Sequence, residues 1–180
     1  LDFLEHTKHP VQVIWAGKPY PKDVESVALF NRLIDITYTN KRSAVLVGYE
    51  LDLSAKLKKG ADVWLNTPRI TREASGTSGM TASMNGAVNL SINDGWIPEY
   101  EKDGENCFII PSRHDFDSLE QQDESDYENL MKVLEEKVVP MYYDDRKKWL
   151  EIAKNSMRDV SPEFESGRMA KEYYERLYNR

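Results

Sequence analysis

The segment AVLVGYELDLSAKLKKGADVWL, residues 44–65, contains two short apolar runs with a charged, helix-like stretch between them. Short runs of mostly apolar residues, here 44–47 and 61–65, are typical of strands that are buried on both faces. Residues 51–59 are predicted to form a helix, because Asp52 lies near its start, two lysines lie in its last turn, and Gly60 follows. The segment therefore predicts a strand–helix–strand unit.

The same pattern precedes this segment. Residues 11–15 form a run rich in β-branched side chains that is followed by Gly17 and Pro19, which predicts a strand that runs into a loop. Residues 23–36 have apolar side chains at three- and four-residue spacing, which predicts an amphipathic helix. Strands that alternate with helices over short connections are typical of a parallel sheet. We therefore predict an α/β fold, a Rossmann-like parallel sheet with helices on both faces.

The chain after residue 65 continues this pattern and then becomes helical. We predict a helix over 80–86, a fourth strand over 87–92 and a short fifth strand over 106–110. Residues 113–125 are rich in acidic and poor in apolar side chains, which predicts a solvated surface loop.

The remaining residues have the apolar spacing of helices. Three helices are predicted, over 126–140, 146–160 and 165–178, and Ser161-Pro162 divides the last two. The sequence thus predicts a Rossmann-like domain over residues 1–125, with C-terminal helices over residues 126–180 that pack on it.

The composition excludes several classes of protein. The chain has 180 residues, of which 40% are hydrophobic and 31% charged, which suits one folded domain and not a disordered segment. The net charge of −7 argues against a nucleic-acid-binding module, which usually carries a basic patch. No apolar run is long enough to span a membrane.

Cysteine and histidine give no sign of a disulfide framework or a metal site. Cys107 is the lone cysteine, and His6, His9 and His114 lie far apart without a ligand partner at helical spacing. We expect Cys107 to be a buried small hydrophobe. The chain opens without a signal peptide, so we expect a cytoplasmic protein. It also lacks an initiator methionine, which is compatible with a piece of a longer protein.

The loop after the third predicted strand carries the candidate site. Residues 73–79 read Glu-Ala-Ser-Gly-Thr-Ser-Gly and lie between a strand and a helix, where open α/β sheets bind ligands. The glycines let the backbone approach a ligand, and free amides at a helix start favour an anion. The Glu73 carboxylate can accept hydrogen bonds from sugar hydroxyls. These residues predict a site for a sugar and a phosphate; the alternative is an ordinary Gly-Ser loop that begins a helix.

Residues 73–80, followed by Met-Asn-Gly at 84–86 and Asp-Gly-Trp at 94–96, resemble the signature of the α-glucan (glycogen, starch and maltodextrin) phosphorylases. The resemblance is greatest to the shorter bacterial and archaeal branch. Further matches follow in the order of the family, at 15–18, 48–49, 60–66, 136–140 and 161–174. The resemblance therefore covers nearly the whole chain.

This resemblance implies the C-terminal part of the second Rossmann-like domain of a two-domain, GT-B-type glycosyltransferase. In that family the active site lies between the two domains. Inorganic phosphate removes a terminal glucose from an α-1,4-glucan and releases glucose 1-phosphate, and the phosphate group of pyridoxal phosphate relays a proton. The implied partners are the glucan, phosphate, glucose 1-phosphate and the N-terminal domain, and the resemblance admits a homodimer of the longer protein.

The resemblance also assigns roles to residues that bind the substrate. Glu73, the catalytic-site residue, would hold the 3-hydroxyl of the transferred glucose. The amides around Ser75 and Gly76 would bind its 3- and 4-hydroxyls.

Other residues are assigned to the cofactor by the same resemblance. Thr77 and Ser78 would bind the phosphate of the cofactor at the helix N-terminus, and Tyr49 and Lys56 would line the cofactor. The family's Schiff-base lysine, however, corresponds to Thr81. A hydroxyl cannot form an imine, so a covalent link at this position is chemically excluded.

Three readings of the whole protein therefore stay open. The first is a phosphorylase that tolerates Thr81, and the second is a catalytically silent relative that binds glucan or sugar phosphate. The third is a sugar-nucleotide-dependent transferase, whose second glutamate, eight residues after the first, also falls on Thr81. The N-terminal domain and the basic segment that holds substrate phosphate in the family are absent from these residues, so we expect this chain alone to be inactive.

The Asp-Gly-Trp segment at 94–96 has two alternative roles. The four tryptophans are expected mainly in the core or packed on loops, and Trp96 is the one that could instead face the cleft, where its ring would stack on a sugar. Asp94 and Glu99 could form a carboxylate pair, but the simpler interpretation is a turn cap at Asp94 and a surface charge at Glu99.

Overall fold

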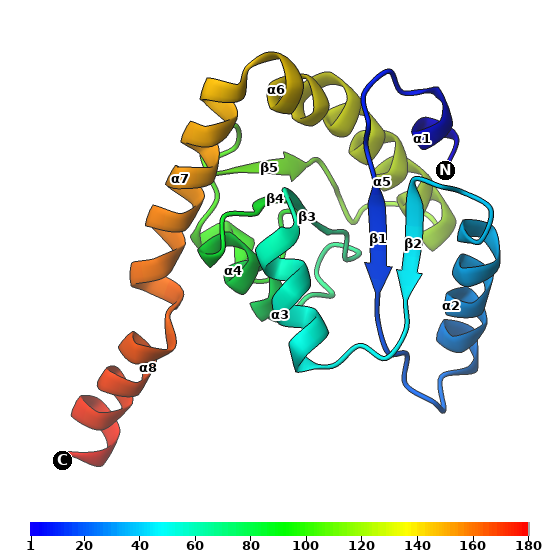
Figure 1. Cartoon of the computed structure of the whole chain (residues 1–180). Coiled ribbons are helices and arrows are strands. Elements are labelled where there is room, and N and C mark those ends of the chain that lie inside the picture. Colours follow the sequence, from blue (N-terminus) through cyan, green and yellow to red (C-terminus); the bar gives the residue numbers. More distant parts are fainter. Residues whose placement is uncertain (180) are drawn as a thin grey trace. The chain divides into compact units, whose positions relative to one another are not determined.

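The computed structural model describes residues 1–179 and divides the chain into two compact units. The first unit is Leu1–Lys56, and the second begins at Leu57. Figure 1 labels the helices and strands of both units.

The first unit contains a parallel pair of strands and helix α2. Strand β1 pairs with β2 so that Val13 lies opposite Ser43. Helix α2 begins after Asp23, whose side chain accepts a hydrogen bond from the Ser26 amide at 3.0 Å, an ordinary N-cap. The elements are α1 (Asp2–His6), β1 (Val13–Ala16), α2 (Val24–Thr37), β2 (Ser43–Leu46) and α3 (Leu51–Gly60), which continues past the end of the unit.

The second unit contains a three-stranded parallel sheet in the order β3-β4-β5. Strand β4 is central, and all five of its residues are buried, as expected for a parallel strand that is covered on both faces. The elements up to the last strand are β3 (Val63–Asn66), α4 (Thr77–Met84), β4 (Val88–Ile92), η1 (Ile97–Glu99) and β5 (Cys107–Ile110). The elements after it are α5 (Leu119–Val133), η2 (Leu134–Val138), α6 (Val139–Asp144), α7 (Arg146–Phe164), α8 (Ser166–Tyr173) and η3 (Tyr174–Tyr178).

The predicted α/β class with parallel strands is confirmed. Within the first unit β1 pairs with β2, and within the second unit β3 pairs with β4, with Val63 opposite Val88. The choice of partner within a sheet depends on tertiary contacts that a run of apolar residues does not encode. The domain division at residue 125 stays a prediction.

The acidic segment 113–125 is helical in its second half, and the prediction of a loop there was wrong. Helix α5 begins at Leu119, and the Ser118 side chain accepts a hydrogen bond from the Gln121 amide at 3.3 Å. Acidic side chains in a first helical turn are favourable, because they face the positive end of the helix dipole. The acidic pattern that predicted a loop is therefore also compatible with the capped start of a helix.

Two prolines do not end helices where the sequence predicts an end. Pro140 lies in α6, which continues directly from the π-helix η2, so the helix runs through this proline to Asp144. Pro162 lies inside α7, which ends two residues later at Phe164. The break before α8 falls instead at Glu165, whose side chain accepts from the Arg168 amide.

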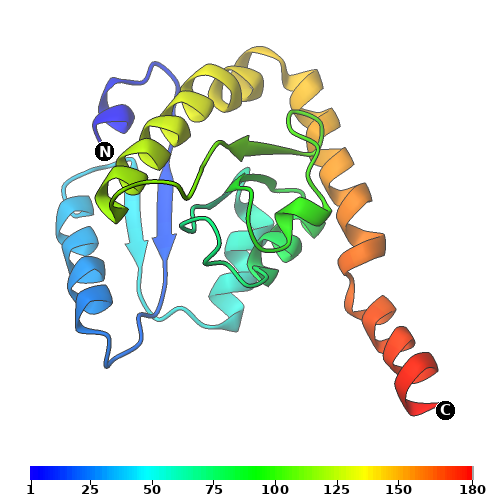
Figure 2. The ribbon, with the colours of Figure 1, turned by 180° about the vertical axis from the view of Figure 1, so that it is seen from behind.

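The core of the second unit joins the sheet to the C-terminal helices. Phe108 of β5 stacks on Trp149 of α7, with ring centroids 6.3 Å apart. Helix α7 also packs against α4, as the view from behind shows (Figure 2). The buried residues of this cluster come from β4, β5 and the helices: Val88, Leu90, Ile92, Phe108, Ile110, Val133, Val138, Trp149, Ile152 and Ala153. Helices α5 to α7 thus share one core with the sheet.

Cys107 is buried in a second cluster with Trp96 and Tyr100, as the sequence predicts. Burial raises the pKa of the Cys107 thiol to about 12. Burial likewise raises the pKa of the Tyr100 hydroxyl to about 12. Both groups are therefore neutral in the folded protein at moderately alkaline pH.

We expect Cys107 to make the protein less stable as the pH rises. The unfolded chain ionises this thiol near its ordinary pKa of 9.0, whereas the folded protein holds it neutral until about 12. The stability that results is complete below the lower value and is lost between the two. Urea unfolding at about pH 8 and about pH 10 should show a smaller decrease in the free energy of unfolding for Cys107→Ala than for the wild type. Equal decreases would contradict the expectation.

Candidate functional site

The candidate loop joins β3 to α4 at the carboxyl edge of the sheet of the second unit. Helix α4 begins at Thr77, three residues before the predicted start, and its N-cap is Gly76 with φ +94°. No side chain caps this helix. The sequence gives no capping signal for this start, because Gly76 supplies a left-handed backbone and not a capping side chain. Thr77 and Ser78 therefore lie in the first turn of α4.

Four successive amides of the loop are free to bind a ligand. Within residues 1–179, the N–H groups of residues 75–78 have no protein acceptor, whereas the Gly79 amide donates to the Gly76 carbonyl at 3.2 Å. Ser75, Thr77 and Ser78 are exposed. Free amides at a helix start, together with the helix dipole, bind anions such as phosphate.

Glu73 lies directly beside these amides. It is half-buried, and its carboxylate has no hydrogen bond or ion pair with another described residue. Its Cγ lies against Gly95, where a Cβ would be 2.7 Å away, and its Cδ lies near Gly76. The side chain is therefore confined by two glycines, and its oxygens are available to accept from ligand hydroxyls.

The beginning of the loop is fixed by an ion pair with helix α5. The Arg69 guanidinium donates to both carboxylate oxygens of Asp123, each at 2.7 Å. This contact lowers the pKa of the Asp123 carboxyl through a hydrogen bond from Arg69. A bidentate pair of this kind fixes direction as well as distance.

Of the two alternatives for Trp96, core packing is the correct one. Its side chain is 2% exposed, and its ring packs on Tyr100 with centroids 4.6 Å apart and edge-on to Phe164. A ring of this size stabilises the protein most when it leaves water.

Asp94 was expected to cap its own turn. Its Oδ2 instead accepts from the amides of Arg72 and Glu73 in the candidate loop.

The residues present fit only part of pyridoxal phosphate. The free amides of the α4 start suit its phosphate group. Thr81, at the position of the family's lysine, is exposed, and its hydroxyl donates to the Thr77 carbonyl at 2.9 Å. Helix α4 contains no lysine. A covalent imine therefore does not fit this helix.

Tyr49 and Lys56 belong to the first unit. The Tyr49 hydroxyl donates to Ser54 Oγ at 2.9 Å, and Lys56 is exposed and forms an ion pair with Asp52 at 2.7 Å. Their role beside a cofactor stays a prediction, whereas residues 73–81 all lie in the second unit.

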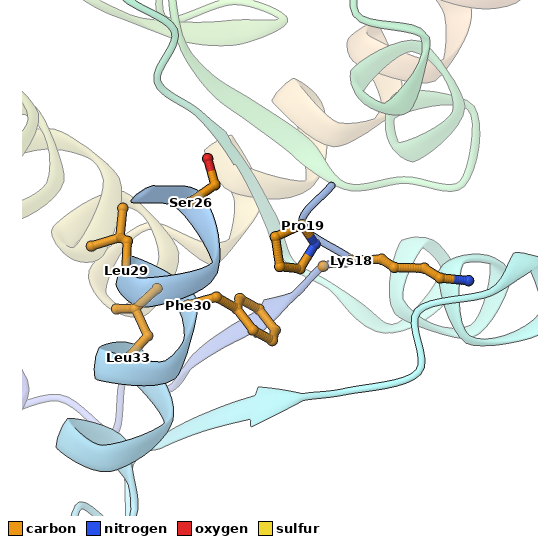
Figure 3. A pocket seen from close by; sticks show the side chains of 7 residues that line it. Lys18, Pro19, Ser26, Leu29, Phe30 and Leu33 are labelled. Carbon is orange, nitrogen blue, oxygen red and sulfur yellow. The ribbon is translucent and has the colours of Figure 1, made fainter. Parts of the chain in front are cut away.

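The loop lines neither of the two following cavities. In the first unit, α2 and Lys18 with Pro19 line a cavity of about 290 Å³ (Figure 3). In the second unit, Asp103, Phe108 and Met141 help to line one of about 540 Å³. In the described part of the chain, no three His, Cys, Asp or Glu side chains form a group that could hold a metal ion. No helix there is long and apolar enough to cross a membrane.

Sequence comparison finds proteins that match nearly the whole chain. MJ1631, an uncharacterized protein of Methanocaldococcus jannaschii, is 44% identical over 95% of this chain and 32% of its own length. Maltodextrin phosphorylase of Thermococcus litoralis is 34% identical over 98% of this chain and 22% of its own length. Glycogen phosphorylase of Aquifex aeolicus is 36% identical over 98% of this chain and 26% of its own length. The chain thus spans a third or less of these relatives. No family model matches it.

Structural comparison agrees on the fold. The crystal structure of Anabaena HepE in complex with UDP-glucose superposes with a TM-score of 0.67 and 19% identity, over 99% of this chain and 44% of that one. The same protein in complex with UDP and glucose gives 0.68 and 18%, over 99% and 43%. The chain therefore has the fold of about half of that protein, consistent with half of a GT-B fold.

Proposed function

We propose, from the premise that the chain is homologous to the C-terminal part of the maltodextrin and glycogen phosphorylases, that it forms the glucose-binding half of an α-glucan phosphorylase-like glycosyltransferase. The observation that carries the proposal is the Glu73 carboxylate, which has no partner among residues 1–179, beside four free amides. Carboxylate oxygens bind vicinal hydroxyls, and amides at a helix start bind phosphate.

Each part of the loop then has a role in the proposed reaction. The Glu73 carboxylate accepts a hydrogen bond from the 3-hydroxyl of the transferred glucose. The amides of Ser75 and Gly76 bind the 3- and 4-hydroxyl oxygens, and those of Thr77 and Ser78 bind the phosphate group of the cofactor. Such fixed donors position the sugar without reorganisation during the reaction. Phosphate and the glucan approach from a second domain of a longer protein, so this chain alone does not turn over.

Pyridoxal phosphate enters the proposal only through its phosphate group. When bound in the related phosphorylases, it supplies acid–base chemistry through that group. Thr81 excludes the covalent link, so any pyridoxal phosphate here is held by the amides of α4 and not by an imine.

A catalytically silent relative that binds glucan or sugar phosphate is the second candidate, and Thr81 is the observation that favours it. Such a protein keeps the Glu73 loop and needs no cofactor. A sugar-nucleotide transferase is the third reading, but Thr81 also stands where the second glutamate of those enzymes is expected.

A purified longer protein that contains this chain tests the proposal. Glucose 1-phosphate formed from maltodextrin and inorganic phosphate, with or without added pyridoxal phosphate, supports the phosphorylase. Calorimetric binding of maltooligosaccharides without turnover supports the silent relative instead. Binding of UDP-glucose or ADP-glucose, with no affinity for glucan or glucose 1-phosphate, contradicts both.

A further inference from the structure

The turn after β4, Asp94-Gly95-Trp96, contacts the glucose-binding loop at successive points. We call these three residues the 94–96 turn. They follow β4 after Asn93, and β4 is the buried central strand of its sheet. A buried strand is among the most rigid parts of a fold. The turn is attached to this strand and can therefore hold the loop at a fixed position relative to the sheet.

Asp94 fixes the backbone at Glu73. Its Oδ2 accepts from the Arg72 amide at 3.0 Å and from the Glu73 amide at 2.9 Å. Hydrogen bonds to a charged acceptor are stronger than those between neutral groups. Thr71, the residue before this pair, has φ +71°, which is strained for a β-branched residue and persists only where neighbours hold it.

The backbone of Gly95 contacts the loop directly, because glycine has no side chain that would hold the two apart. Its φ is +63°, and a Cβ there would lie 2.5 Å from the Ser75 carbonyl oxygen and 2.7 Å from Glu73 Cγ. The loop thus rests directly on the Gly95 backbone, and any side chain would displace both Ser75 and Glu73.

Trp96 completes the contact. Its amide donates to the Ser75 carbonyl at 2.9 Å. Its buried ring lies under Gly76 and Gly79, at 3.2 Å and 3.1 Å from the Cβ that either residue would carry. The ring therefore fixes the position of the first turn of α4 by its contacts with these two glycines.

We propose that Asp94 and Gly95 are positioning residues for Glu73. Through the 94–96 turn, β4 sets the direction of the Glu73 carboxylate and of the free amides of residues 75–78. Neither residue needs to touch the ligand. For its effect on binding, the proposal rests on the proposed function, whereas its effect on the loop does not.

Asp94→Ala and Asp94→Asn form the first test, because asparagine keeps an acceptor oxygen and alanine does not. Amide hydrogen exchange at Glu73 should accelerate about tenfold or more in Asp94→Ala. The Arg72 amide is the less sensitive reporter, because it also donates to the Arg69 carbonyl at 3.0 Å. Asp94→Asn should recover much of the protection. Binding of glucose 1-phosphate, measured by calorimetry, should weaken about tenfold in Asp94→Ala and be restored in part by Asp94→Asn.

A double-mutant cycle separates positioning of Glu73 from a general effect on the fold. If Asp94 acts through Glu73, Asp94→Ala should weaken binding less in a Glu73→Gln background than in the wild type. An equal loss in both backgrounds would show that Asp94 acts on the fold as a whole, which overturns the proposal.

Gly95→Ala tests the contact below the loop, with Gly104→Ala as the matched control. Gly104 also has a positive φ, +74°, but a Cβ there would meet no atom within 4 Å. Gly95→Ala should weaken glucose 1-phosphate binding about tenfold or more beyond the effect of the control. Equal effects would contradict the proposal.

These outcomes distinguish the positioning role of Asp94 and Gly95 from the proposed function of the chain. Unchanged exchange at Glu73 in Asp94→Ala overturns the positioning role, whatever ligand the protein binds. Faster exchange in a protein whose wild type binds neither glucose 1-phosphate nor maltooligosaccharide supports the positioning role and overturns the proposed function.

Discussion

Glu73→Gln is expected to weaken binding of glucose 1-phosphate by about tenfold to a hundredfold, because a hydrogen bond to a charged group contributes about 1.5–3 kcal/mol. The amide keeps the size of the side chain but replaces one acceptor oxygen with a donor. Glu73 has no protein partner among the described residues, so the free energy of unfolding should change little. Calorimetry and urea unfolding measure the two quantities.

Glu99→Gln is the matched control for this variant. Glu99 is exposed in η1 and is also unpartnered within residues 1–179, so the same loss of charge should leave affinity unchanged. A similar loss in both variants would indicate that net charge, and not a contact at Glu73, governs binding.

Trp149→Ala is expected to lower the free energy of unfolding by about 3–5 kcal/mol, as other large-to-small changes of buried aromatics do. Trp149 is 3% exposed, stacks on Phe108, and meets Tyr142 edge-on with centroids 5.1 Å apart. This loss is a large part of the stability of an ordinary domain. Urea unfolding that is followed by circular dichroism measures it.

Leu150→Ala provides the comparison on the same helix. Leu150 is 44% exposed, so its truncation should cost about 1 kcal/mol or less. If Trp149→Ala cost no more than this control, helix α7 would not share the core of the sheet.

The strands could be predicted from the sequence because each is a short apolar run. The predicted runs at 87–92 and 106–110 lie within one residue of β4 and β5. Their pairing could not be predicted, since partner choice depends on contacts between distant residues. The predicted positions of helix ends were wrong where the sequence signal was indirect. Examples are the helix start after Ser118, within an acidic segment, and Pro162, which lies inside α7.

The candidate loop was visible in the sequence because glycines, hydroxyls and a carboxylate occur together at 73–79. Two properties of it were not visible. The burial of Trp96 beneath Gly76 depends on the three-dimensional path of the loop. The strained backbone of Thr71 has no sequence signal, because threonine is not a residue that favours a positive φ.

The most direct test of the central claim follows the backbone amides of residues 75–78 by NMR while glucose 1-phosphate is added. The account predicts that these amides shift with saturation in the wild type, and that Glu73→Gln raises the concentration needed about tenfold or more. Shifts confined to other parts of the chain, or shifts of residues 75–78 that Glu73→Gln leaves unchanged, would contradict it.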